Sequence, residues 1–173
     1  ANAFGNVVIT SKDLTATSGK ANFNNEQHRL ELTIDPVAVR RNSKVSGELI
    51  VVHFDESAIN SIDVTNSARA EFNEPVSHDT TYIDQSILKG KEIHFNFTDG
   101  KMTSIISYNQ AYSWYFPSSR ADTMFRENTI SGDTIKFLTS DERLTEVQVI
   151  GGAVGQYLWA PISARAPGST VAV

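Results

Sequence analysis

Apolar and polar residues alternate in three stretches of the chain, and each stretch follows a glycine. After Gly47, Gly90 and Gly132 the odd positions are mostly apolar, whereas the even positions are mixed. A period of two is typical of a β-strand with one face turned to a core. A polar turn (DES, TDGK or SDER) ends each run, and a second alternating run follows it. Each stretch therefore predicts a β-hairpin.

The three stretches are copies of one another. Their first glycines lie 43 and 42 residues apart, and five columns keep one residue type at a fixed distance from the glycine. The columns are Ile50, Ile93 and Ile135; Ile59, Met102 and Leu144; Ile62, Ile105 and Val147; Ala68, Ala111 and Ala153; Phe72, Tyr115 and Tyr157. This agreement indicates an internal repeat, with units of about residues 47–72, 90–117 and 132–161.

Small or turn-forming residues interrupt the second strand of each unit. They are Asn66-Ser67-Ala68, Asn109-Gln110-Ala111 and Gly151-Gly152-Ala153. Such residues suit a sharp bend better than a flat strand. Long antiparallel strands with a bend midway, stacked at a fixed period, predict an all-β fold of two layers whose apolar faces line the space between them. No stretch predicts an amphipathic helix.

The rest of the chain is assigned to the same domain. Residues 1–46 are interpreted as a divergent unit, so residues 1–161 are expected to form one domain and 162–173 an extended tail. The polar stretch 118–131 between two units is expected to form a loop. Ala1 falls within an alternating run, so we expect the natural chain to begin earlier.

Composition excludes several classes of function. The 173 residues carry a net charge of −5 with scattered basic residues, which argues against nucleic-acid binding. No run approaches the roughly 20 apolar residues of a membrane span. Cysteine is absent, which removes disulfides, thiol catalysis and thiolate metal sites.

Histidines and carboxylates offer little chemistry. His53 and His94 occupy even positions, at different distances from their glycines, so they are expected to be solvated and need not meet; His28 and His78 lie in turns. No metal motif, nucleophile elbow or phosphate-binding loop occurs. Acidic residues in the hairpin turns are too sparse for calcium. We therefore expect no enzyme activity, no catalytic residue, no metal and no cofactor.

The repeat resembles the OstA-like (organic-solvent-tolerance) family, the family of lipopolysaccharide transport protein A. The likeness is clearest at Gly132–Ile135 and in Leu144–Ala153, which match G-x-x-I and L-x-x-V-x-V-x-G-x-A before Tyr157; Leu14–Gly47 is also similar. The resemblance implies a V-shaped β-jellyroll, open at both ends, in the periplasm of a Gram-negative bacterium. It also implies an interior groove for the acyl chains of lipopolysaccharide or a similar amphipathic lipid. Such domains join end to end through exposed edge strands, which implies a homo-oligomer or an OstA-like partner.

The inward-facing positions become candidate residues of a lipid-binding groove. They are Ile50, Val52, Phe54, Ile62, Val64, Ile93, Phe95, Phe97, Ile105, Tyr115, Ile135, Phe137, Val147, Val149 and Tyr157. Small residues such as Ser113 and Gly155 would leave room for an acyl chain. Two alternatives stay open: the same residues fill a closed core, or the chain is a structural module that self-associates through its edge strands without a lipid.

Overall fold

The computed structural model of this chain describes residues 1–11, 14–55, 58–76, 79–117, 124–141 and 143–161. This described part consists of β-strands joined by turns and contains no helix. The strands are β1 (Asn2–Thr10), β2 (Leu14–Asn24), β3 (Arg29–Thr33), β4 (Val37–Arg40), β5 (Ser43–Ser46), β6 (Leu49–Phe54), β7 (Ile59–Val76), β8 (Asp79–Thr98), β9 (Lys101–Phe116), β10 (Met124–Ser140), β11 (Arg143–Ile150) and β12 (Val154–Pro161). The all-β class predicted from the alternation is confirmed.

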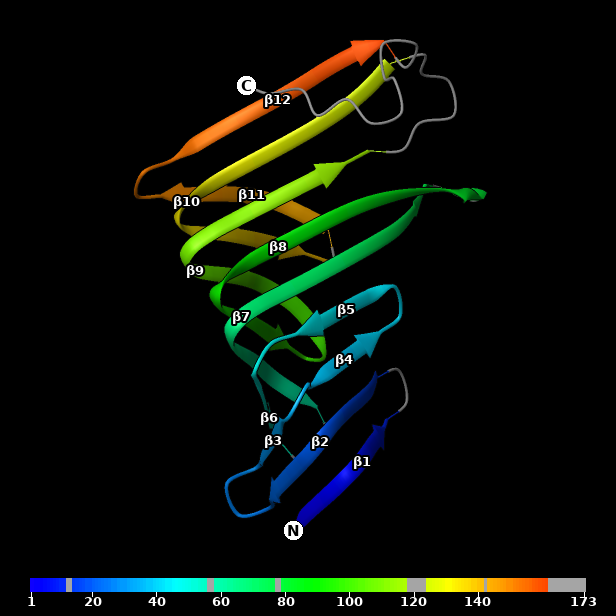
Figure 1. The fold of residues 1–173 in the computed structure, drawn as a ribbon, viewed down its shortest axis with the longest axis vertical. Helices are drawn as coiled ribbons and strands as arrows, with labels where there is room; N and C mark the ends of the chain where they lie inside the picture. Colours follow the sequence, from blue (N-terminus) through cyan, green and yellow to red (C-terminus); the bar gives the residue numbers. More distant parts are fainter. Residues whose placement is uncertain (12–13, 56–57, 77–78, 118–123, 142, 162–173) are drawn as a thin grey trace.

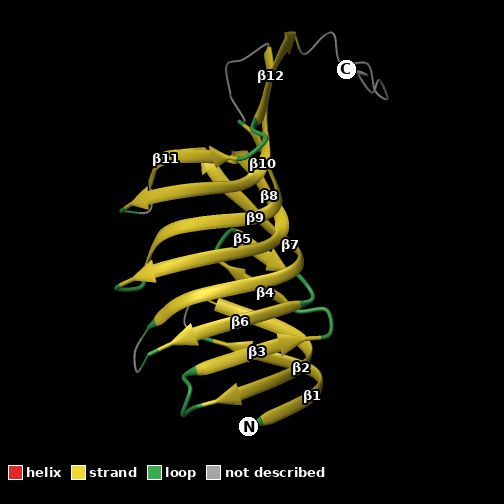
Figure 2. Cartoon of the chain, turned by 90° about the vertical axis from the view of Figure 1, so that its left-hand side faces the viewer, coloured by secondary structure: helices red, strands yellow, loops and turns green. Residues whose placement is uncertain are grey.

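All strand pairs are antiparallel and belong to one 12-stranded sheet that bends sharply along a line. The long strands run through this line and change partner there. Residues 59–65 of β7 pair with β6, and residues 69–72 pair with β5. Likewise, residues 134–140 of β10 pair with β11, and residues 124–131 pair with β12. The bent strands stack into an open-ended V (Figures 1 and 2).

We call the two arms of the V wall A and wall B. Wall A contains residues 2–4, 20–24, 29–33, 49–54, 59–65, 91–98, 101–108, 134–140 and 143–150. Wall B, in front in Figure 1, contains residues 7–10, 14–18, 37–40, 43–46, 68–76, 79–89, 111–116, 124–131 and 154–161. Among the described strands, β1 is the outermost strand at one end of the stack, and β11 and β12 are the outermost at the other, each with one ladder edge unpaired.

The bend lies where the repeat predicted it. Both residues of each interrupting pair have a positive φ: 59° and 54° at Asn66-Ser67, 59° and 64° at Asn109-Gln110, and 73° and 55° at Gly151-Gly152. Two consecutive left-handed residues turn the strand out of its plane. Ile34-Asp35, between β3 and β4, has the same conformation at 65° and 52°. This fourth corner was not predicted, because isoleucine and aspartate give no glycine-like signal.

The glycine that starts each unit lies against a corner of the next strand. A Cβ at Gly47, Gly90 or Gly132 would lie 2.8 to 3.2 Å from a backbone carbonyl oxygen of Thr65, Tyr108 or Gly151, respectively. Only a residue without a side chain lets the two backbones approach so closely. The repeated glycine is therefore part of the corner rather than the beginning of a strand.

The prediction of a loop over 118–131 was wrong for its second half. Residues 124–131 form the wall B part of β10 and pair with both β9 and β12; 118–123 and the expected tail 162–173 lie outside the described residues. Met124–Ser131 is too polar to alternate clearly, so its sequence does not indicate a strand. It forms one because β9 and β12 pair with its backbone on both sides.

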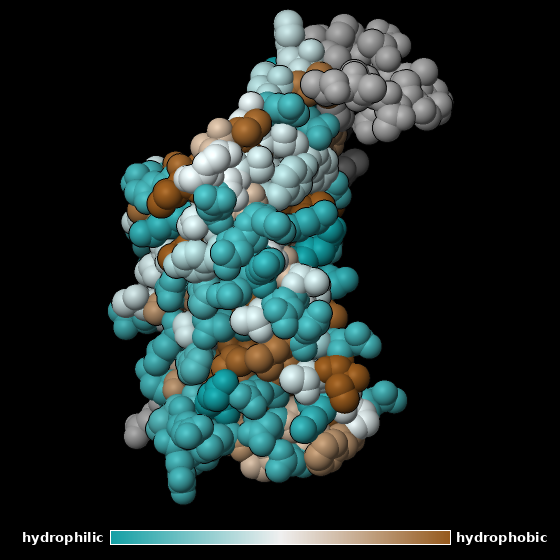
Figure 3. Space-filling model, turned by 60° about the vertical axis from the view of Figure 1, so that its left-hand side comes forward, coloured by the Kyte–Doolittle hydropathy of each residue, from teal (hydrophilic) through white to brown (hydrophobic). Residues whose placement is uncertain are grey.

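The apolar faces of both walls point into the V. One row of wall A, Leu32, Ile50, Val64 and Ile93, runs across four adjacent strands and is wholly buried. It packs in one cluster with a row of smaller residues on wall B: Ala16, Ala38, Val45 and Ala70. By contrast, the outer surface on the corner side is mainly hydrophilic, with apolar residues in separate patches (Figure 3).

Candidate functional site

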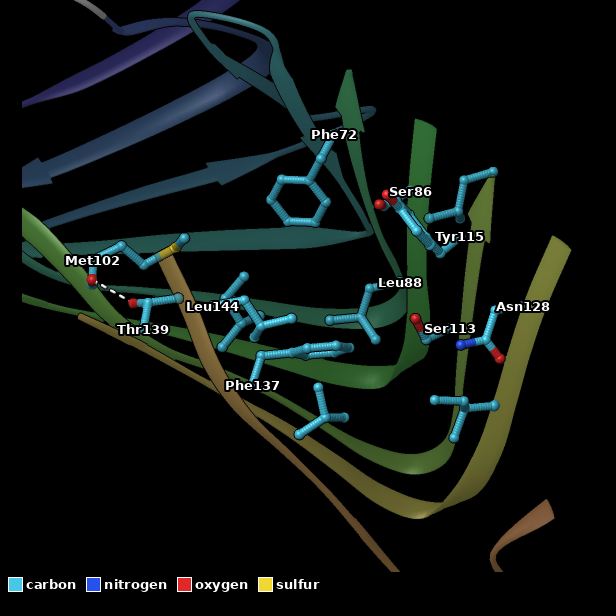
Figure 4. Close-up of a pocket in the computed structure, with 14 residues that line it drawn as sticks. Phe72, Ser86, Leu88, Met102, Ser113, Tyr115, Asn128, Phe137, Thr139 and Leu144 are labelled. Carbon is cyan, nitrogen blue, oxygen red and sulfur yellow. Dashed lines mark hydrogen bonds between the residues drawn. The ribbon is translucent and has the colours of Figure 1, made fainter. Parts of the chain in front are cut away.

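A groove opens between the two walls toward the end of the stack that carries β11 and β12. Its volume is about 570 Å³, and Figure 4 shows it between the arms of the V. Strands β7 to β11 line it through Phe72, Ser86, Ile87, Leu88, Met102, Ile105, Ser113, Tyr115, Asn128, Ile130, Phe137, Thr139, Leu144 and Val147. Pockets for small ligands commonly have volumes of this order, roughly 300 to 1,000 Å³.

Wall A provides the apolar side of the groove. Its lining residues are Met102, Ile105, Phe137, Thr139, Leu144 and Val147. Thr139 is the polar member, and its hydroxyl donates a hydrogen bond of 2.6 Å to the carbonyl oxygen of Met102 (Figure 4). Because that donor is already engaged with the backbone, wall A presents a hydrocarbon surface to the groove.

Wall B provides a mixed side. Phe72, Ser86, Tyr115 and Asn128 are direct partners in the ladders of β7, β8, β9 and β10, so their side chains share the inner face as one row. A second row closer to the corner contains Leu88, Ser113 and Ile130. Figure 4 places Ser86, Tyr115, Ser113 and Asn128 along this arm, opposite Phe137 and Leu144. Hydroxyl and amide groups thus face a hydrocarbon wall.

Tyr115 is held in its neutral form at the mouth of the groove. Its hydroxyl donates a hydrogen bond of 3.0 Å to Oδ2 of Asp84. Burial, together with the bond to the Asp84 carboxylate, raises the pKa of Tyr115 to about 12. The side chain therefore remains a phenol at physiological pH.

Most of the predicted groove residues fill the interior of the V rather than the groove itself. Ile50, Val52, Ile62, Val64, Ile93, Phe95 and Ile105 belong to the buried cluster, and Phe97 and Phe137 pack against it. Ile135 is also fully buried, Val149 is half-buried, and Phe54 stacks on Phe23 with ring centroids 5.4 Å apart. Four of the fifteen line the groove: Ile105, Tyr115, Phe137 and Val147. Tyr157 extends the inner row of wall B and is 64% exposed.

Sequence reasoning missed the part of the groove that precedes Gly90 and Gly132. Ser86, Leu88, Asn128 and Ile130 lie outside the three units predicted from the repeat. Every second residue is inward there too, but the inward set mixes serine and asparagine with leucine and isoleucine. The alternation changes phase at the corner, where the ladders shift register between Lys89 and Glu92 and between Gly132 and Thr134, so extending it backwards through the glycine would have selected the outward residues.

The end of the stack beyond the groove exposes further apolar side chains. Tyr157 and Trp159 are 64 and 60% exposed on the inner face of β12, the last strand segment of wall B. The groove-lining Leu144 of β11, the last strand segment of wall A, is 58% exposed. The groove therefore continues into an uncovered apolar surface at this end, whereas the other end is filled by the core cluster.

Two histidines that the sequence did not require to meet share one carboxylate on the outer face of wall A. Asp63 Oδ1 lies 2.7 Å from His94 Nδ1, and Asp63 Oδ2 lies 3.1 Å from His53 Nε2. Asp63 pairs directly with His94, and β6 brings His53 to the diagonal position. Within the described residues no group of three or more His, Asp or Glu side chains is arranged to hold a metal ion. The same residues also contain no helix that is long and apolar enough to span a membrane.

Fold and groove together define a β-jellyroll of V-shaped section with open ends. No family model and no curated protein matches the sequence. Among solved structures, the chain is similar to LptH, described as the LptA-homologous periplasmic component of the lipopolysaccharide transport device from Pseudomonas aeruginosa. The TM-score is 0.57 with 16% sequence identity, over 76% of this chain and 80% of LptH. This likeness confirms the fold class predicted from the repeat.

Proposed function

We propose that this chain is a periplasmic lipid-binding module that shelters acyl chains of lipopolysaccharide type in the groove and passes them toward the outer membrane. The observation that carries the proposal is an open, largely apolar groove of about 570 Å³ inside an LptH-like fold. LptH is described as a component of a lipopolysaccharide transport device, and the same class of ligand suits the groove of this chain. The proposed location in the periplasm rests on the same likeness.

Energetics favour a conduit over a trap. Burying a methylene group is worth roughly 0.8 kcal/mol, so a chain of about a dozen carbons gains on the order of 10 kcal/mol relative to water. Relative to a membrane or to another groove of the same kind, the gain is near zero. A lipid would therefore enter the groove readily and leave it readily for the next apolar site, without a catalyst.

The test compares two substitutions on adjacent residues of β11. Val147 lines the groove, whereas Gln148 points to the opposite face. Val147→Glu and Gln148→Glu each add one negative charge, and Val147 is already 38% exposed, so both variants should fold. We expect Val147→Glu to weaken binding of a fluorescent acyl-chain probe at least about tenfold, because a carboxylate in an apolar site is costly. Gln148→Glu should bind like the parent.

Two results would end this proposal. One is the absence of saturable acyl-chain binding by the parent protein under conditions where circular dichroism shows it folded. The other is equal probe affinity in the two variants, which would place the bound chain somewhere other than the groove.

A second candidate function is a self-associating structural module. The unpaired ladder edges of β1, β11 and β12 in the described stack favour it, because bare edges add further strands readily. A homo-oligomer or a chain of similar fold would be the partner. Oligomers seen by sedimentation, lost in an edge variant such as Val8→Pro, with no acyl-chain binding in either protein, would favour this function over lipid transport.

A further inference from the structure

The groove has a chemical asymmetry that a simple hydrocarbon site would not need. Wall A presents carbon atoms, whereas wall B places Ser86, Ser113, Tyr115 and Asn128 along the groove. Tyr115 already donates to Asp84, but a plain acyl chain in this groove would offer no partner to Ser86, Ser113 and Asn128. Desolvating a polar group without giving it a hydrogen bond costs about 1 to 3 kcal/mol, so such an arrangement disfavours an unsubstituted chain.

The polar groups on wall B are neutral. None of the fourteen lining residues is a lysine, arginine, histidine, aspartate or glutamate. The nearest carboxylate in the inner row is Asp84, which accepts the hydrogen bond from Tyr115. Arg126 is the next residue of β10 on the same face as Asn128, but it is exposed and does not line the groove. A phosphate drawn into the groove would therefore meet neutral donors and the Asp84 carboxylate, which is poor compensation for losing water.

We propose that the groove prefers amphiphiles whose acyl chain carries a neutral hydrogen-bonding group, a hydroxyl or an amide, over plain chains and over ligands that place a phosphate inside the groove. This inference rests on the proposed lipid-binding function and names its ligand class. The substituent would bind the Asn128 amide, while the rest of the chain packs against Phe137, Leu144 and Val147. An amide side chain both donates and accepts, so it matches either substituent.

Three matched ligands test the preference on the full chain. They are tetradecanoyl glycerol, the same compound with a β-hydroxyl on the acyl chain, and tetradecanoyl glycerol phosphate, each competing with a fluorescent acyl probe below its micelle concentration. One net hydrogen bond predicts that the hydroxylated chain binds about fivefold more tightly than the plain chain. The phosphorylated ligand should bind no more tightly than the plain neutral one.

Two variants assign the preference to wall B. Asn128→Leu should abolish the fivefold difference and raise the affinity for the plain chain, because an apolar side chain replaces an amide that the plain chain would desolvate. Thr129→Val alters the next residue of β10, which faces away from the groove, and should keep the difference intact. Thermal unfolding of both variants checks that each retains the fold.

The outcomes of these experiments distinguish a failure of the ligand preference from a failure of the lipid-binding function. If the plain and hydroxylated chains bind saturably and equally, the selectivity is overturned and the lipid-binding function stands. If the phosphorylated ligand binds most tightly, the groove selects anions and the inference is wrong. If Asn128→Leu keeps the preference, the polar wall is not its source. If none of the three ligands binds, the proposed function itself fails.

Discussion

The two halves of the V share one backbone plan but differ in what lies between the walls. Toward β1 the interior is filled: Leu32, Ile50 and Val64 pack with alanines of the opposite wall and are inaccessible to water. Toward β11 the same inward rows continue, yet they enclose a groove of about 570 Å³. Inward orientation alone therefore does not determine whether the interior is a core or a cavity.

Side-chain size accounts for part of the difference. The wall A row that reads Leu32, Ile50, Val64 and Ile93 in the filled half continues as Ser107, Ile135 and Val149. On wall B, the row continues past Leu88 to Ser113, Ile130 and Gly155. Ser107 thus stands in a wall A row that otherwise holds leucine, isoleucine and valine, so side-chain atoms are missing there. Wall B shows no such loss, because its row holds alanine and valine in the filled half.

Contact across the open side of the V accounts for another part. In the filled half the Arg40 guanidinium of wall B lies over the Phe97 ring of wall A, 5.8 Å from its centroid. The two walls therefore approach each other there up to their outer margins. In the hollow half, Tyr115 of wall B is 38% exposed and bonds to Asp84 of its own wall. That margin is left open to a ligand.

The comparison is tested most strongly by truncating the same residue type in each half. Ile50 is fully buried in the filled half, and Ile130 lines the groove. Ile50→Ala should lower the free energy of unfolding by about 2 to 5 kcal/mol, because it leaves a cavity in a packed core. Ile130→Ala should cost about 1 kcal/mol, because the space beside it is already empty. Urea denaturation measures both, and equal losses would mean that the hollow half is packed like the filled half.

Corner glycines, in contrast, should matter equally in the two halves. Gly47 and Gly132 both face a backbone carbonyl at 3.2 or 3.0 Å from a built Cβ, whereas Gly155 has no atom closer than 4.0 Å. Gly47→Ala and Gly132→Ala should each destabilise the fold by about 1 to 3 kcal/mol through forced backbone shifts. Gly155→Ala is the control and should change stability by no more than about 0.5 kcal/mol. If Gly132→Ala did not lower the stability, the backbone at this corner of the hollow half would be able to shift and accommodate the added methyl group.

These contrasts also mark what could be predicted from the sequence. The alternation after each glycine identified the strands and their inward face, and the Asn66-Ser67 and Gly151-Gly152 pairs located the corners. Both signals are local: side-chain direction follows from strand geometry, and a left-handed pair favours particular residues. The fold was predictable because the same alternation and the same corner position occur in all three units.

The groove depended on distances between residues far apart in the chain, and these were not predictable. Phe72 and Val147 line one space although 75 positions separate them. Nothing in a period of two says how closely wall A approaches wall B, so fully buried residues such as Ile50 and Ile93 were candidates alongside Val147. The contact of His53 and His94 with Asp63 was not predictable for a similar reason. It depends on the register between β6, β7 and β8, and the two histidines occupy unequal positions in their units.

Enlarging an inward side chain should destabilise the filled half more than the hollow half. Ala70 and Ser113 occupy the same inward row of wall B on either side of Leu88. Ala70→Leu inserts three carbons into a packed site and should cost about 1 to 3 kcal/mol. Ser113→Leu places its side chain in the groove, so it should cost less than about 1 kcal/mol while lowering acyl-probe affinity. Urea unfolding and probe binding are measured on the same samples. A larger loss of stability in Ser113→Leu than in Ala70→Leu would contradict the difference between the two halves.

The smallest expected effect concerns alkaline pH and the margin of the hollow half. Because burial and the bond to Asp84 raise the pKa of Tyr115 from 10 to about 12, the folded chain holds this proton where the unfolded chain releases it. The stability it contributes is therefore complete below about pH 10 and declines as the pH rises toward 12. Tyr115→Phe should make the loss of stability over this interval shallower and remove the last tyrosine to titrate in the near-ultraviolet absorbance. A Tyr115 that ionises together with freely solvated tyrosines would mean that water reaches this margin unhindered, and the groove would then lack the sheltered wall on which its ligand preference depends.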